Sequence, residues 1–276
     1  MSPAWAILAA LALAPAAAAP APAPPAPAEH AAADTAVAAA RCLYLPPAIE
    51  RRVVFYHSFE AGPDRPEINT LGGRFEPGAA TPCDGVAGRG VEIADGKVAG
   101  PLLRGLALPM HRPVTVMLWW QMRRELPIDG GFNVVSLRGP RGYVSNFVRG
   151  GPWCALKEPN VVLQVWNWPG ISNVNDLRGP VERKPGPWRH AALVVSRASA
   201  VRVLWDGQVR ADVGLKGRTF LPNDVVDALA FGGPGMRLDE LLVLDVALDD
   251  AAVRDYLAAV RHLAAAGFPA VAPPGR

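Results

Sequence analysis

The stretch 187–215, PWRHAALVVSRASAVRVLWDGQVRADVGL, decides the fold of this chain. It holds two short apolar runs, Trp188–Ser196 and Ala200–Trp205, and their length and composition predict a β-hairpin. The Asp-Gly pair at 206–207 then predicts a tight type I′ turn into a third strand, Gln208–Val213, because both central positions of that turn need a positive φ. Consecutive short strands joined by tight turns indicate an all-β, antiparallel β-sandwich.

The rest of the chain repeats this pattern. Residues 228–248, ALAFGGPGMRLDELLVLDVAL, predict a Gly-rich turn followed by a last buried strand. Pro113–Met122 is apolar on both alternating faces, which is typical of a central strand covered on both sides. Residues 60–88 are rich in Gly, Pro and Asp and predict a long loop with at most a short strand. Further strands are expected at Arg52–Phe59, Gly88–Ile93, Leu102–Leu108, Phe132–Leu137, Tyr143–Val148 and Val161–Trp168.

One short helix is expected at the C-terminal end. Val253, Leu257, Val260 and Leu263 recur at helical spacing after the last strand. Asp249 stands where its side chain can accept a free backbone N–H of the first turn. We therefore expect a helix packed on the end of the sandwich.

The N-terminal part predicts export. Residues 4–14, AWAILAALALA, are too short for a membrane span, and small residues follow at 16–19. No Lys or Arg precedes this run, so an Ala-rich disordered tail is the alternative. The predicted organisation is a signal peptide (1–19), an Ala/Pro-rich spacer (20–48), one domain (49–265) and a disordered tail (266–276). The mature protein is expected to have no transmembrane segment and to be secreted, periplasmic or at the cell surface.

Composition narrows the possible partners. Charged residues make up 19% of the chain, the formal net charge is +3, and no run of five Lys or Arg occurs, so nucleic acid is not an expected partner. Three cysteines, Cys42, Cys83 and Cys154, allow one disulfide in an oxidising compartment, and the sequence does not choose which pair forms it. No CxxC motif is present, which argues against a structural zinc site.

Several of these pieces together resemble the LamG-like jelly-roll family of the concanavalin A-like lectin/glucanase superfamily. The matching stretches, which start with Phe59–Gly62 and continue in order along the chain, are GVAGRGVEI (85–93), VTVMLWWQM (114–122), PWRHAALVV (187–195), VRVLWDGQ (201–208) and RLDELLVLDVALDDAAVRDYL (237–257). The resemblance implies two curved antiparallel sheets with one concave face, and first and last strands that pair. It implies no single function, because this fold hosts lectins, glycosidases, lyases and adhesion modules.

Catalytic motifs are missing from the sequence. Glycosidases need two carboxylates that face one sugar ring, and no Glu-x-Asp-x-Glu pattern is found. His57, His111 and His190 are isolated in sequence. We therefore expect an exported, non-enzymatic module that binds carbohydrate or an extracellular protein. A divergent glycosidase or lyase, with paired carboxylates on the concave face, and a purely structural or adhesion domain, with an aliphatic concave face, are the alternatives.

Two candidate sites emerge from the residues. Carbohydrate-binding proteins stack aromatic rings on sugars and bind the hydroxyls with polar side chains, which predicts a ligand-binding patch at Trp153, Trp166, Asn167, Trp168, Asn173 and Asn175. The alternative is that Trp166 or Trp168 packs in the core, because alternate residues of a strand share one face.

The second candidate is a calcium site. If the first and last strands pair as the resemblance implies, Glu60 comes near Asp239, and converging carboxylates suit Ca²⁺. The alternative is that both acids cap turns and pair with Arg237 or Arg65.

Overall fold

The computed structural model describes residues 45–96, 100–125, 131–151, 156–168, 171, 174–180, 184–196, 200–215 and 219–266. The predicted signal peptide, most of the predicted spacer, and the cysteines Cys42 and Cys154 lie outside the described residues. Cys83 forms no disulfide with any described residue. Within the described part of the chain, no helix is long and apolar enough to span a membrane.

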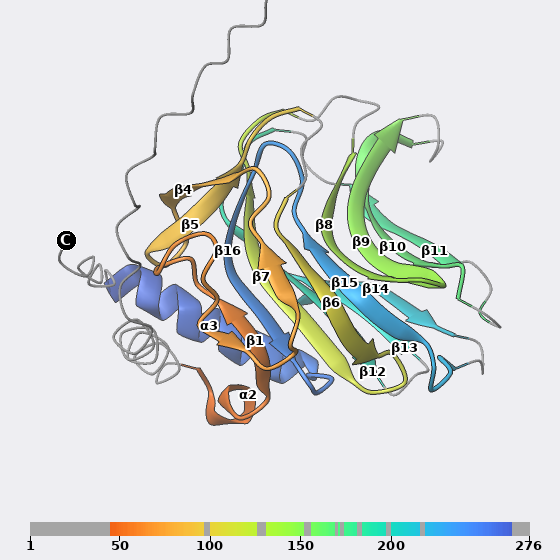
Figure 1. The fold of residues 1–276 in the computed structure, drawn as a ribbon. Helices are drawn as coiled ribbons and strands as arrows, with labels where there is room; N and C mark the ends of the chain where they lie inside the picture. Colours follow the sequence, from red (N-terminus) through yellow and green to blue (C-terminus); the bar gives the residue numbers. More distant parts are fainter. Residues whose placement is uncertain are drawn as a thin grey trace, which may run out of the picture.

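The described strands form two antiparallel sheets that face each other (Figure 1). The first sheet runs in the order β14 (Gln208–Gly214), β13 (Ala200–Trp205), β12 (Arg189–Ser196), β7 (Val114–Met122), β16 (Met236–Leu244), β1 (Val53–His57) and β2 (Ile68–Asn69). The hairpin of β4 (Ala80–Asp84) and β5 (Arg89–Ile93) joins the same sheet through β16.

The second sheet runs in the order β11 (Val174–Pro180), β10 (Leu156–Trp166), β9 (Gly142–Gly151), β8 (Gly131–Gly139), β15 (Val225–Phe231), β6 (Leu102–Pro109) and β3 (Arg74–Glu76). Every strand pair described in either sheet is antiparallel. The predicted all-β antiparallel sandwich is therefore confirmed.

Strand β7 explains how the sandwich is layered. Val116, Leu118 and Trp120 belong to the core between the two sheets. Met117 and Trp119, which alternate with them, belong to a second apolar cluster on the outer face of the first sheet. The prediction of a central strand covered on both faces is confirmed, because apolar residues at every position need a packed neighbour on each side.

Two helices cover that outer face, whereas one short helix on the end of the sandwich was expected from the sequence. Helix α3 (Asp250–Ala266) buries Val253, Tyr256 and Val260 against it, and Ile49 of the short helix α2 (Pro47–Glu50) joins the same cluster (Figure 1). The backbone N–H of Ala252 donates to Asp249 Oδ1 at 2.8 Å, which confirms the predicted helix cap.

The turn and the strand pairing also agree with expectation. Asp206 and Gly207 have φ values of 50° and 76°, as a type I′ turn requires. Strands β1 and β16 pair antiparallel, with His57 opposite Leu241.

Three regions differ from the sequence predictions. Residues 60–88 contain the three short strands β2, β3 and β4, whose few residues alternate too briefly to show a period. Strand β11 lies in a stretch that the sequence assigned to a ligand patch. Strand β15 was not predicted, because its alanines give it a weak strand signal.

Candidate ligand-binding site

The outer face of the second sheet is hollowed. A pocket of about 760 Å³, which we call the hollow, lies over β8, β9 and β10 and the β8–β9 turn. This volume is within the range of small-ligand sites. No described helix covers this face, in contrast to the first sheet. The described residues that line the hollow are Gly131, Phe132, Asn133, Ser136, Arg138, Gly139, Pro140, Arg141, Gly142, Tyr143, Ser145, Val148, Gln164 and Asn167.

The floor of the hollow is polar because its strands alternate. Leu137, Val144 and Val165 point into the core. Their neighbours along the strands therefore face outward, and Ser145 lies opposite both Ser136 of β8 and Gln164 of β10. Ser136 and Ser145 are only 3% exposed, whereas the side-chain amides of Asn133 and Gln164 are partly exposed and are groups of the kind that bind sugar hydroxyls.

Hydrogen bonds hold several of these side chains in place. Tyr143 Oη donates to Gln164 Oε1 at 2.8 Å, and Ser145 Oγ donates to Asn133 Oδ1 at 3.3 Å. Arg141 Nη2 donates to Asp224 Oδ1 at 2.7 Å, and this carboxylate is fully buried. The polar groups are thus arranged before any ligand arrives, which lowers the entropy cost of binding.

Tyr143, which lines the hollow, has an aromatic neighbour, Trp166, that is not itself part of the described lining. Trp166 at the end of β10 lies directly opposite Tyr143 of β9, and both side chains are partly exposed. Aromatic rings on a solvent-facing sheet surface can stack against the apolar face of a sugar. Asn167 follows with a φ of 62°, is exposed, and lines the hollow.

The predicted patch is brought together only in part. Asn167 lines the hollow, Trp166 lies opposite the lining residue Tyr143 without lining the hollow itself, and Asn175 of β11 is opposite Gln164 in register. Trp168 does not face ligand: it is 2% exposed and packs edge-on against Phe220, as the alternative interpretation held. Trp153 and Asn173 lie outside the described residues.

Trp168 instead supports the rim of the hollow. A Cβ atom added at Gly139 or Gly142, at the two sides of the β8–β9 turn, would collide with Trp168. The turn therefore closes directly over the indole, which requires glycine at both positions because nothing else fits. Sequence reasoning also missed Tyr143 and Gln164, whose only signal was that they alternate with valines along two strands.

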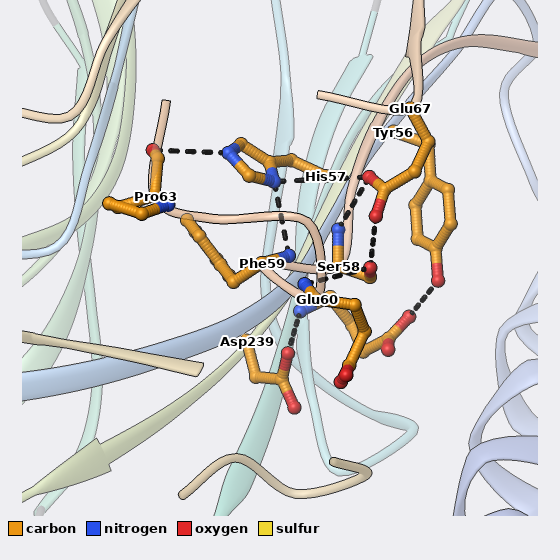
Figure 2. A network of polar contacts seen from close by, with 9 residues as sticks. Tyr56, His57, Ser58, Phe59, Glu60, Pro63, Glu67 and Asp239 are labelled. Carbon is orange, nitrogen blue, oxygen red and sulfur yellow. Dashed lines mark hydrogen bonds and ion pairs between the residues drawn. The ribbon is translucent and has the colours of Figure 1, made fainter. Parts of the chain in front are cut away.

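The two predicted calcium ligands lie in a second polar region, which we call the corner (Figure 2). Asp239 is fully buried, and its Oδ2 accepts the N–H groups of Val86 and Ala87 at 2.8 and 3.2 Å. Its Oδ1 accepts the N–H of Glu240 at 2.8 Å. Glu60 Oε1 accepts the N–H of Arg89 at 2.5 Å. Both carboxylates therefore bind the backbone of the β4–β5 turn.

No metal cluster is found among the described residues, since no three His, Cys, Asp or Glu side chains converge as a metal site requires. The expected partner is also different, because Arg237 pairs with Glu92 at 2.8 Å rather than with Asp239. The geometry of the corner favours turn capping over calcium binding.

A buried acid and a buried histidine complete the corner (Figure 2). Both Ser58 N–H and Ser58 Oγ donate to the carboxylate of Glu67. His57 Nδ1 accepts the N–H of Phe59 at 3.1 Å, so its Nε2 carries the proton that it donates to Pro63 O at 3.2 Å. No local sequence pattern indicates this network, because Glu67 lies in the stretch that is predicted to be a long loop.

Burial sets the charges in the corner. It lowers the pKa of His57 to about 3 and raises the pKa of Glu67 to about 7, the latter opposed by hydrogen bonds from Ser58. The 3.8 Å contact between His57 Nδ1 and Glu67 Oε2 is therefore not an ion pair at neutral pH, because the imidazole is neutral. Both side chains are at most 1% exposed, so no substrate reaches them. We therefore expect the buried polar groups of the corner to stabilise the fold rather than to bind a ligand.

Comparisons with known proteins locate this fold. No family model and no curated protein sequence matches the chain. Among solved structures, the binding domain of Paraclostridial Mosquitocidal Protein 1 superposes with a TM-score of 0.56 and 13% identity. The match covers 74% of this chain and 51% of that domain. This chain thus spans about half of that binding domain.

Two further similar structures were solved as complexes, one with an oligosaccharide and one with a protein. Domain 4 of AbnA, an extracellular GH43 arabinanase of Geobacillus stearothermophilus solved with arabinotriose, matches with a TM-score of 0.53 and 18% identity, over 74% of this chain and 98% of that domain. The botulinum neurotoxin DC binding domain, solved with rat synaptotagmin II, matches with a TM-score of 0.50 and 8% identity, over 69% of this chain and 47% of that domain. At these identities the likeness establishes the fold: this chain is a β-sandwich of the type that occurs in binding domains.

Proposed function

We propose that this chain is an exported, non-enzymatic module that binds glycans in the hollow on the outer face of its second sheet. The observation that carries the proposal is the open, polar hollow, whose lining includes Tyr143, with Trp166 of the neighbouring strand directly opposite Tyr143. Stacking surface next to fixed hydroxyl and amide groups is the combination that a sugar ring requires. Export rests on the apolar run at 4–14 in the sequence.

Two features of the hollow support binding without cleavage. The described lining contains no Asp or Glu, whereas a glycosidase needs two carboxylates on the substrate. Its described lining is mostly polar, with Phe132, Pro140 and Val148 as apolar members, which argues against a purely structural, aliphatic face. The arabinotriose complex of a similarly folded domain adds support from the fold alone.

A glycan array tests the proposal. The wild-type protein is expected to bind at least one glycan class, and Trp166→Ala is expected to weaken this binding about tenfold, since aromatic contacts are worth roughly 1 kcal/mol or more. Trp166→Phe should retain most of it. Trp188→Ala is the matched control, because Trp188 is also partly exposed but packs beside the cluster under α3. Failure of the wild type to bind any glycan would refute the proposal, and binding only to proteins would replace it.

A further inference from the structure

A row of side chains crosses the outer face of the second sheet. It begins with Trp166 of β10, which is opposite Tyr143 of β9, and Tyr143 is opposite Arg138 of β8. Val165, Val144 and Leu137, their neighbours along the three strands, are in the core, so all three row members face outward. This aromatic pair is therefore the start of a longer line.

The row continues across the rest of the sheet. Arg138 is opposite Ala228 of β15, Ala228 is opposite Arg104 of β6, and Arg104 is opposite Arg74 of β3. The six positions span five strand gaps, or roughly 24 Å at about 4.8 Å per gap. The side chain of Ala228 is small, so it does not block an oligosaccharide that lies along the row between Arg138 and Arg104. This length suits an oligosaccharide of several units.

We call Arg138, Arg104 and Arg74 the arginine row. All three side chains are exposed. Arg104 makes a surface ion pair with Glu76 at 3.2 Å. Among the described residues, Arg138 and Arg74 have no carboxylate within ion-pair distance, and Arg138 makes only a long 3.5 Å contact with Ser136 Oγ. The row thus presents two guanidinium groups, those of Arg138 and Arg74, that no described carboxylate neutralises.

We propose that the glycan bound by this module is anionic, and that its carboxylate or sulfate groups bind the arginine row while a sugar ring stacks at Trp166. This inference rests on the proposed function and specifies its ligand class. Guanidinium groups form paired hydrogen bonds with carboxylates and sulfates, so arginines spaced along the row on β8, β6 and β3 match charges repeated along a polysaccharide. A neutral glycan would leave these charges without a partner.

The observations favour a glycan over single-stranded nucleic acid. Nucleic-acid grooves place aromatic rings along the strand, so that successive bases stack. Here both aromatic residues stand at one end of the row, and the remaining contacts are charged or small. The partly exposed side-chain amides of Asn133 and Gln164 beside the row also match sugar hydroxyls.

Native gels cast with one dissolved polymer each test the inference. The polymers are polygalacturonate, heparin, neutral arabinan and single-stranded oligo-dT. We expect polygalacturonate or heparin to retard the wild-type protein with a dissociation constant at least about tenfold below that for arabinan. The double variant Arg138→Gln/Arg74→Gln should weaken this binding about tenfold, from roughly 0.5–1 kcal/mol per exposed pair. Raising NaCl should weaken the wild-type interaction, because exposed charges are screened.

A matched control separates the row from net charge. Arg51→Gln/Arg254→Gln removes the same charge from exposed arginines at α2 and α3, beside the opposite sheet, and should change the dissociation constant by less than about twofold. Equal weakening by both double variants would overturn the role of the row. Equal or tighter binding of arabinan would overturn the anionic preference but leave glycan binding standing. Retardation by oligo-dT above all would point to nucleic acid, and no retardation by any glycan would overturn the proposed function itself.

Discussion

The corner and the hollow are both rich in polar side chains, yet they use them in opposite ways. In the corner, Asp239 and Glu67 are buried and accept hydrogen bonds from backbone and side-chain groups of the same chain. In the hollow, Asn133, Tyr143 and Gln164 are partly exposed on a sheet face that no described helix covers. Polar residues that satisfy one another inside a fold stabilise it, and those fixed at an open surface are available to a ligand. The comparison predicts stability effects at the corner and binding effects at the hollow.

The largest stability effect is expected at Trp168, and Trp166, two residues earlier, provides the comparison. Trp168→Ala should lower the free energy of unfolding by about 3–5 kcal/mol, because it empties a core site beneath the β8–β9 turn. Trp166→Ala should lower it by about 1 kcal/mol or less, since its ring is partly exposed. Urea unfolding measures both. Similar losses for the two variants would contradict the assignment of opposite faces.

Asp239→Ala is expected to cost about 3 kcal/mol of stability and to leave glycan binding unchanged. It removes the acceptor of three backbone N–H groups, two of which are buried, that of Ala87 at the β4–β5 turn and that of Glu240 in β16. Asp227→Ala, at an exposed position of β15, is the control and should change stability by no more than about 0.5 kcal/mol. A loss of binding without a loss of stability in Asp239→Ala would mean that the corner is a site after all.

Glu67→Gln tests the charge state of the corner. Because burial raises the pKa of Glu67 from 4.5 to about 7, the folded protein retains a proton that the unfolded chain has released in this window. This group therefore makes stability fall as the pH rises from 4.5 to 7. The variant lacks that fall, so its free energy of unfolding at pH 7 minus that at pH 4.5 should exceed the wild-type difference by up to about 3 kcal/mol.

The titration of His57 is not expected to change the difference in pH dependence between the wild type and Glu67→Gln. Burial holds the pKa of His57 at about 3, below its usual 6.5, so its contribution is lost as the pH falls from 6.5 towards 3. That contribution has the opposite sign to that of Glu67, is present in both proteins, and cancels in the comparison. Identical pH profiles for wild type and Glu67→Gln would show that Glu67 is ionised in the folded state.

Calcium should have the smallest effect. The oxygens of Asp239 and one oxygen of Glu60 already accept backbone N–H groups. We therefore expect the melting temperature to be unchanged by CaCl₂ or by EDTA. A rise with CaCl₂ that is absent in Asp239→Asn would restore the calcium site predicted from the sequence.

The local sequence pattern was sufficient to predict most of the β-sandwich. The Asp-Gly turn at 206–207, the two-sided strand at Val114–Met122 and the cap at Asp249 each depend on neighbouring residues, so they can be read without tertiary information. The short strands in 60–88 depend on partners far along the chain, and their few residues carry no period of their own.

The site was predictable only where it is continuous in sequence. Trp166 and Asn167 were predicted together because they are adjacent, and the same adjacency included Trp168, whose side chain is turned into the core beyond the end of β10. Tyr143 and the arginine row were missed because strand register, and not sequence distance, brings them together.

Hydrogen exchange with bound ligand tests the central claim most directly. Wild-type protein is compared with and without arabinotriose, a galacturonate tetramer and a heparin tetramer, each at a concentration that is raised until exchange no longer changes. With ligand bound, we expect slower exchange in peptides from 131–145 and 160–167, which form the hollow. We expect no change in 53–67 or 236–244, which form the corner. Slower exchange at the corner or in α3 with the hollow unaffected, or no change with any of the three, would contradict this expectation.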